Sequence, residues 1–288
     1  MREFVITTDS TVDLPKAFLE EKKVNILRLS YIIDGTTYQD MGELSCKEFM
    51  DKIREGAMPT TSQVNPEQAK DMFEEIVKEG KDILHIAFTS GLSGTYNSER
   101  IAAEELMEEY PDAKIVVIDS LCASMGQGLL LYKALELRDA GKSMDEIATW
   151  VEANKLNVCH TVAIDDLYHL HRGGRVSKAS AVVGSVIGIK PILQIDEEGR
   201  LAVIAKERGR KKSLISLINR MEEQSKGFEN DVAMIVHGDC EEDAEFLKKQ
   251  MKERFGIDNV IINGIGAVIG SHTGPGVIAV FFMGEKIK

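Results

Sequence analysis

One stretch constrains the fold of this chain more than any other. It joins an apolar, strand-like run, Ile83–Phe88, to a helix-like run, Thr95–Glu109, through the loop Thr89–Gly94. That loop consists of Ser, Thr and Gly with a single Leu, and its glycines let the backbone approach a ligand closely. The free amides that open the following helix carry partial positive charge. The stretch predicts a strand–loop–helix unit able to hold an anion, although the same residues also suit an ordinary helix cap.

The rest of the first half alternates in the same way. Strands are expected at Phe4–Thr8 and Ile115–Ile118, and Asp34-Gly35 is a hairpin turn signal. Helix starts are marked by cap pairs three residues apart, namely Ser45 with Glu48, Asn65 with Gln68, and Ser143 with Glu146. Alternating strands and helices predict a mostly parallel sheet covered on both faces, with ligands bound at the carboxyl ends of its strands.

Small polar residues gather where the ligand of such a sheet would lie. They occupy Thr8–Pro15, the segment Thr60–Gln63 and Asp119–Gly128, in addition to the first loop. Thr60–Gln63 is expected to be a polar loop just ahead of a helix that starts at Pro66. Its alternative interpretation is a solvated loop with no role in binding.

The second half has a different pattern. A strand is expected at Val158–Ala163, a hairpin from Ile192–Ile195 to Leu201–Ala205, and a helix over Lys178–Gly188 with small residues on one face. A hairpin among alternating elements predicts an α+β arrangement. We therefore expect an α/β protein of two domains: a Rossmann-like parallel-sheet domain at 1–155 and an α+β domain at 156–288.

His272 lies in the glycine-rich segment Gly264–Phe282, between two strand-like runs. It is the only one of the six histidines in such a segment, which is expected to be a loop. Glycines on both sides indicate a constrained backbone and favour a functional role, whereas a solvated loop histidine is the alternative.

Composition narrows the function classes. The formal net charge of −12 argues against a nucleic-acid backbone as partner, because such binding needs clustered Lys and Arg. The four cysteines stand far apart, which fits neither a zinc site nor a disulfide framework. The chain starts directly with strand-like residues rather than a signal peptide, so a cytoplasmic location is expected. Neither a cofactor nor a metal is predicted.

Seven segments occur in an order that resembles the DegV family of fatty-acid-binding proteins, including its FakB type. The similarity covers essentially the whole chain, and only the ordered set makes it specific. The segments are TDSTVDLP, PTTSQ, FTSGLSGTYNS, IDS before a small-residue loop, LHRGGRVS, KPIL and SHTGPGVIAVFF.

The resemblance implies a long-chain fatty acid buried between two domains, with its carboxylate held by Thr61, Ser93 and His272. Those donors would form a neutral cradle. It further implies a carrier without catalytic activity, which presents the acid to a separate ATP-dependent kinase for acyl-phosphate formation in phospholipid synthesis. Neighbouring residues expected to support the site are Ser62, Gly94, Thr95, Ser120 and Arg172. Acyl-chain preference and oligomeric state are not predicted.

Two other function classes stay open at this point. Ser93, His272 and an aspartate such as Asp119 could form the triad of a serine hydrolase or acyltransferase. The GLSGT segment, however, is not the GxSxG nucleophile elbow of such enzymes. A binding module for another small anion is the third class.

A basic cluster begins the helix expected at Arg208–Ser225. In an acidic protein such a cluster is either a solvated helix start or a surface that steers an acidic partner or an anionic membrane into transient contact. The resemblance assigns kinase docking to Arg208. The cluster comprises Lys206, Arg208, Arg210, Lys211 and Lys212.

Overall fold

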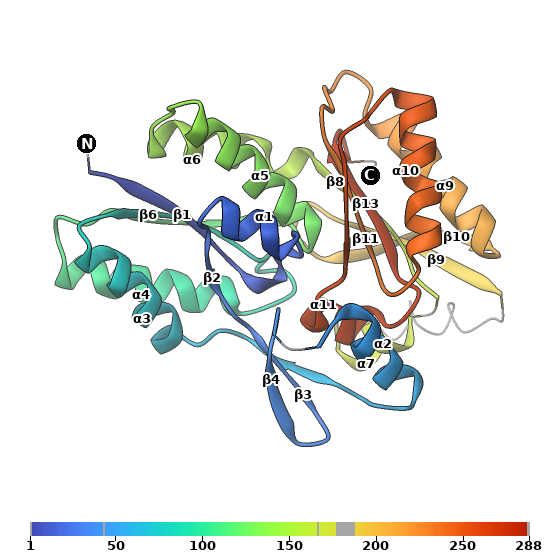
Figure 1. Ribbon diagram of the computed structural model, residues 1–288, viewed down its shortest axis with the longest axis horizontal. Helices are drawn as coiled ribbons and strands as arrows, with labels where there is room; N and C mark the ends of the chain where they lie inside the picture. Colours follow the sequence, from blue (N-terminus) through green and yellow to red (C-terminus); the bar gives the residue numbers. More distant parts are fainter. Residues whose placement is uncertain (1, 43, 166, 177–187, 287–288) are drawn as a thin grey trace.

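The structure is a computed structural model that describes residues 2–42, 44–165, 167–176 and 188–286. Its first half forms a four-stranded parallel sheet (Figure 1). Its two central strands are largely buried, as expected for a sheet covered on both faces. In spatial order they are β2 (Asn25–Leu27), β1 (Phe4–Asp9), β6 (Asp82–Ala87) and β7 (Ile115–Asp119).

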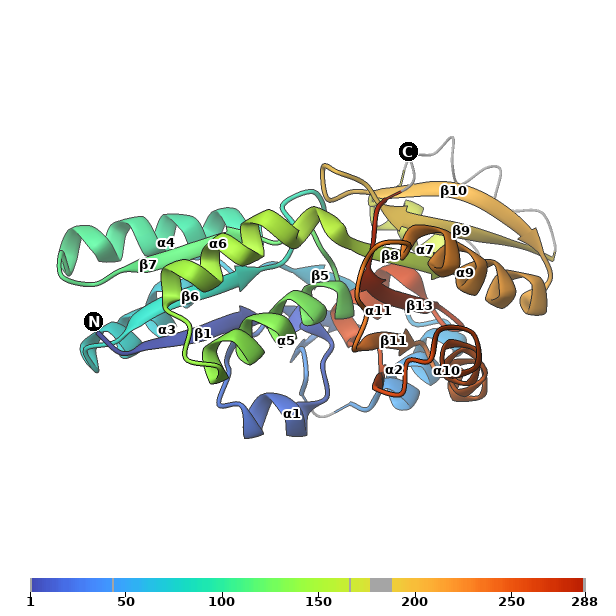
Figure 2. The ribbon, with the colours of Figure 1, turned by 90° about the horizontal axis from the view of Figure 1, so that it is seen from above.

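Helices cover both faces of this sheet (Figures 1 and 2). On one side lie α3 (Pro66–Lys78) and α4 (Thr95–Glu109), and on the other α5 (Met125–Asp139) and α6 (Met144–Asn154). The predicted capping boxes of α3 and α6 are present, and so is that of α2 (Cys46–Arg54).

The second half forms a six-stranded mixed sheet. One face packs on α9 (Arg210–Gln224) and α10 (Glu241–Phe255), and the other packs on α5. Successive residues of strand β13 (Ile278–Met283) point to opposite faces of the sheet. Val280 and Phe282 face α9 and α10, whereas Phe281 faces the core shared with α5. In spatial order the strands are β10 (Leu201–Arg208), β9 (Ile189–Ile195), β8 (Val158–Ala163), β13 (Ile278–Met283), β11 (Ala233–His237) and β12 (Val260–Gly264).

A third, small sheet is formed by a segment of the first half and lies against α11 (Ala267–Thr273) of the second. Strand β3 (Ser30–Ile33) pairs with β4 (Thr36–Gln39) through the predicted Asp34-Gly35 turn. It also pairs with β5 (Thr60–Ser62), so the prediction of a loop at Thr60–Gln63 is wrong for its first three residues. The free edge of β3 supplies backbone partners that a reading of the local sequence cannot reveal.

Two other expectations need correction. His272 lies not in a loop but in the last turn of a short helix, α11 (Ala267–Thr273). Arg208 ends strand β10, where it pairs with Ile189, and does not begin a helix. Gly209, at φ 88°, makes the turn into α9. The helix expected over Lys178–Gly188 falls almost entirely outside the described residues.

The α/β fold class is confirmed. All strands of the parallel sheet precede residue 155 and all strands of the six-stranded sheet follow it, but the domain division at that residue stays a prediction. Two further helices, α1 (Lys16–Glu21) and α7 (Tyr168–Arg172), are short. Within the described residues, we find no helix with the length and apolar character needed to cross a bilayer.

Candidate functional site

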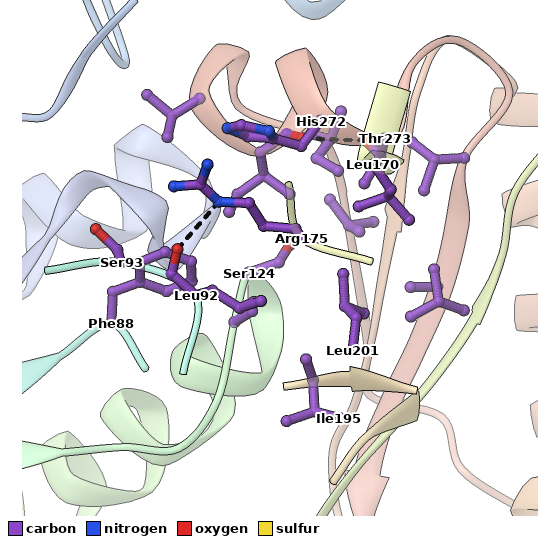
Figure 3. Close-up of a pocket in the computed structure, with 18 of the residues that line it drawn as sticks. Phe88, Leu92, Ser93, Ser124, Leu170, Arg175, Ile195, Leu201, His272 and Thr273 are labelled. Atoms are coloured by element: carbon purple, nitrogen blue, oxygen red, sulfur yellow. Dashed lines mark hydrogen bonds between the residues drawn. The ribbon is translucent and has the colours of Figure 1, made fainter. Parts of the chain in front are cut away.

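A cavity of about 310 Å³ lies where the three sheets and α11 meet (Figure 3). Its walls come from the loops after β6 and β7, from strand β5 and from the inner face of the six-stranded sheet. This is the carboxyl end of the parallel strands, where the sequence predicts a ligand.

Most of the cavity wall is apolar. Val277, Ala279 and Phe281 line it from β13 and the residue before it, at alternate positions that all point to one face. From Val277 to Phe281 there are four residue steps, or about 13 Å of strand. Val162 and His160 on β8 lie opposite Ala279 and Phe281. An elongated apolar ligand can therefore lie along these strands.

One end of the cavity is polar. Thr61 Oγ1 and His272 Nε2 form a hydrogen bond of 2.8 Å between residues 211 positions apart in the chain. Ser93 also lines the cavity, and its Oγ lies 3.0 Å from Thr95 Oγ1 and accepts a hydrogen bond from the Thr95 amide. The structure thus places the three predicted head-group residues around one cavity.

His272 is held in its neutral form. Burial, together with the neighbouring Arg175 and Arg172 guanidiniums and His169, lowers the pKa of its imidazole to about 4. Its Nδ1 is buried and has no hydrogen-bond partner. Gly173 packs against this nitrogen so closely that no larger residue fits there. Because Nδ1 is covered, Nε2, which is hydrogen-bonded to Thr61, is the ring nitrogen left to meet a ligand in the cavity.

Arg175 is a site residue that the sequence analysis missed. Among the described residues that line the cavity it is the only Lys or Arg, and none of them is Asp or Glu. In Figure 3 its guanidinium lies between His272 and the loop that carries Ser93. Its Nε donates to the Leu92 carbonyl at 3.1 Å, and its Nη1 donates to the Gly173 carbonyl. The polar end therefore carries a fixed positive charge, so the neutral cradle expected from the hydroxyls and imidazole is incomplete.

The residues expected to support the site lie in several different places. Ser62 lines the cavity beside Thr61, and Thr95 is buried beneath Ser93. Gly94 lies against the side-chain amide of Gln63.

Arg172 and Ser120 do not line the cavity. The Arg172 guanidinium donates to the carbonyls of Pro59, at 2.9 Å, and Ser271, at 3.3 Å, so it ties the start of β5 to α11. Ser120 is buried in a turn with Cys122.

Other polar lining residues were not named as site residues: Gln63 and Ser124, which lie in segments expected near the ligand, and Thr273 and His160. His160 interrupts an apolar strand run, which is the one signal that could have identified it. Its Nε2 accepts from the Ala123 amide at 3.2 Å, its Nδ1 lies 3.2 Å from the Val158 carbonyl, and burial lowers its pKa to about 3. A fully hydrogen-bonded neutral ring behaves as part of the apolar wall.

The hydrolase triad is not assembled. His272 Nε2 bonds Thr61 rather than Ser93, and Ser93 bonds Thr95. The Asp119 carboxylate accepts from the backbone amides of Ser90 and Leu121. No two of the three proposed triad members are joined to each other by these bonds, which is not the relay that a serine nucleophile needs.

Asp9, His85 and Glu99 form a group of metal-ligand type within the described part of the chain. The Asp9 carboxylate already accepts from Phe88 N, Thr11 and Gln127. His85 Nε2 lies 3.1 Å from Glu99 Oε1. Hydrogen bonds account for the Asp9 carboxylate, and none of the three residues lines the cavity.

The chain is similar to known proteins along nearly its whole length. Residues 3–285 match a family model described as "Uncharacterised protein, DegV family". A DegV domain-containing protein of Clostridium perfringens is 48% identical over 287 residues, which cover 99% of both chains.

Solved structures match along the whole chain. A structure that describes fatty-acid binding by a DegV family protein from Thermus thermophilus is 30% identical, covers 99% of this chain and 100% of its own, and has a TM-score of 0.88. A stearic-acid-binding protein from Eubacterium ventriosum is 25% identical over 98% of both chains, with a TM-score of 0.87.

Proposed function

Because this chain belongs to the DegV family, we propose that its cavity holds a long-chain fatty acid, with the carboxylate at Thr61, Ser93 and His272. The observation that carries the proposal is the division of one cavity into an apolar wall along β8 and β13 and a polar end where, of the lining residues that the structure describes, Arg175 alone is Lys or Arg. An amphiphile with a carboxylate head fits that division. The fatty acids bound by the similar structures support the same ligand class.

The two ends of the cavity have different energetic roles. Burying about fourteen methylenes is worth on the order of 11 kcal/mol before entropy costs, at ~0.8 kcal/mol each. A hydrogen bond to a charged group contributes roughly 1.5–3 kcal/mol. The acyl chain therefore supplies most of the affinity, and the polar residues orient the head group.

We further propose that the protein is a carrier and not an enzyme. It would present the carboxylate to a separate ATP-dependent kinase, which forms the acyl phosphate used in phospholipid synthesis. The separation of Ser93, His272 and Asp119 into different hydrogen-bond pairs supports this role. Arg208, at the end of β10, is proposed as a docking residue for the kinase.

The experiment that tests the proposal is native mass spectrometry of the protein as purified, followed by extraction and gas chromatography of the bound lipid. Fatty acid in near-stoichiometric amount is expected. A protein that emerges empty, and that takes up no added palmitate or stearate, would contradict the proposal. Stoichiometric labelling of Ser93 by a fluorophosphonate, with turnover of p-nitrophenyl esters, would replace the carrier by the hydrolase.

A further inference from the structure

The segment after β1 contains Asp13, a buried acid to which the fatty-acid proposal assigns no role. Asp13 is buried at 3% exposure, and its backbone lies in the left-handed region at φ 52°. Its Oδ1 accepts from the Gly266 amide at 2.9 Å, and its Oδ2 accepts from Ser124 Oγ at 2.6 Å. The carboxylate thus reaches from the parallel sheet to the start of α11 and to a residue that lines the cavity.

A second buried carboxylate acts on the same helix. Asp40 is fully buried, its Oδ1 accepts from the Val268 amide at 3.3 Å, and its Oδ2 accepts from Ser10 Oγ at 2.9 Å. The N-cap of α11 is Gly266, which has no side chain to accept from the free amides of the first turn. Two carboxylates from chain positions more than two hundred residues away therefore perform the capping.

Burying these groups side by side is unfavourable by itself. Burial and the neighbouring Asp40 raise the pKa of Asp13 well above its ordinary value, and burial raises the pKa of Asp40 to about 6. Ser124, the hydroxyl partner of Asp13, also has a strained backbone, at φ 54° and ψ −141°. Strain and desolvation persist only where the surrounding contacts compensate for them, and they concentrate at functional sites.

The far end of α11 shows what these contacts position. His272 lies in its last turn and bonds Thr61, while the helix is only seven residues long. A helix this short has little stability of its own, so its position depends on tertiary contacts, and the two carboxylates supply those of its first turn. We propose that Asp13 and Asp40 are positioning residues, which hold α11 so that His272 meets Thr61 at the polar end of the cavity. The proposal rests on the assignment of that end to the fatty-acid head group.

Gly266 offers a way to disturb the contact from the helix side. Its φ of −66° suits any residue, but a methyl group there would lie 2.5 Å from Asp13 Oδ1 and 3.4 Å from Asp40 Oδ1. Gly266→Ala therefore displaces α11 while both carboxylates remain. From the other side, Asp13→Gly removes the carboxylate and adopts φ 52° without strain. Asp13→Asn keeps one acceptor oxygen and tolerates the left-handed backbone, so it is the rescue variant.

The readout is the titration of His272 in delipidated protein labelled with ¹⁵N-histidine, with its signal assigned through His272→Gln. Gly266→Ala and Asp13→Gly are expected to move the midpoint of His272 from about 4 toward the ordinary 6.5, because the ring leaves its buried position beside Arg172, Arg175 and His169. Asp13→Asn should keep the parent midpoint. Ser143→Ala is the matched control, since it removes a cap from α6, which does not line the cavity.

Folded Gly266→Ala and Asp13→Gly proteins with the parent midpoint would overturn the proposal, as would an equal shift in Ser143→Ala. If one of the two variants fails to fold, the other decides. The titration needs no ligand, so it is separate from the fatty-acid proposal. A parent that binds no fatty acid would refute the ligand, whereas an unmoved His272 would refute the positioning role.

Discussion

Replacing His272 by Gln should change how the stability of the protein depends on pH. Burial and the two nearby guanidiniums lower the folded-state pKa of His272 to about 4, against 6.5 in an exposed chain. Between these values the unfolded chain binds a proton that the folded protein does not. The unfolding free energy of the parent therefore falls as the pH falls from 6.5 to 4, and the variant lacks this contribution.

The magnitude follows from the gap between the two pKa values. At about 1.4 kcal/mol per pK unit, His272 lowers the unfolding free energy of the parent by at most about 3 kcal/mol at pH 4. This loss of stability vanishes above pH 7. The other perturbed buried groups, Asp9, Asp13, Asp40 and His160, titrate in both proteins. The difference between parent and variant therefore isolates His272.

The assay is urea unfolding of delipidated parent and His272→Gln at several values between pH 4 and 7.5. The stability of the parent minus that of the variant should be greatest at pH 7.5 and should decline steadily below 6.5. A difference that stays constant over the whole range would mean that His272 titrates normally in the folded protein. The buried, cation-flanked environment described above would then be wrong.

Three further predictions concern the proposed ligand and the proposed kinase partner. Thr61→Ala and Ser93→Ala should keep the fold and most of the bound fatty acid, because the acyl chain dominates binding, but phosphorylation by the kinase should be slower. A Ser93→Ala protein that is phosphorylated at the parent rate would show that Ser93 does not hold the head group. Arg175→Gln should weaken binding of ionised palmitate roughly five- to tenfold and leave hexadecanol binding unchanged, as judged by calorimetry. Arg200→Gln, an exposed neighbour paired with Glu198, should change neither. Arg208→Ala should retain its lipid yet need more kinase to reach the parent phosphorylation rate, most clearly at low salt, where charge steering is strongest. If the phosphorylation rates of parent and variant depend identically on kinase concentration in about 20 mM salt, Arg208 is ordinary solvated surface.

The features that could be predicted from the sequence are those determined by nearby residues. A capping box needs only two side chains three positions apart, and all three predicted boxes occur. The Asp34-Gly35 hairpin and the bounds of Thr95–Glu109 depend on local backbone preference in the same way. The parallel sheet followed from alternation, because strands joined by helices have few other arrangements.

The misplaced elements depend on distant contacts. The glycines around His272 predicted a loop, since glycine disfavours helices by about 1 kcal/mol each. In α11 that cost is offset by tertiary contacts. Gly270 lets Met50 and Phe49 pack against the helix, and the distant carboxylates cap its first turn. Strand β5 likewise exists because β3 offers it an edge.

Arg175 shows why composition alone did not define the charge of the site. In the sequence, Arg172 and Arg175 begin and end a basic turn, Arg172–Arg175, and only Arg172 was expected to support the site. The direction of each side chain depends on the turn at Gly173 and Gly174, with Gly174 at φ 75°, and on which carbonyls lie within reach. Arg172 turns to Pro59 and Ser271, outside the cavity, whereas Arg175 turns to Leu92 and lines it. Two arginines three residues apart therefore take different roles: one joins β5 to α11, and the other supplies the only positive charge among the described cavity-lining residues.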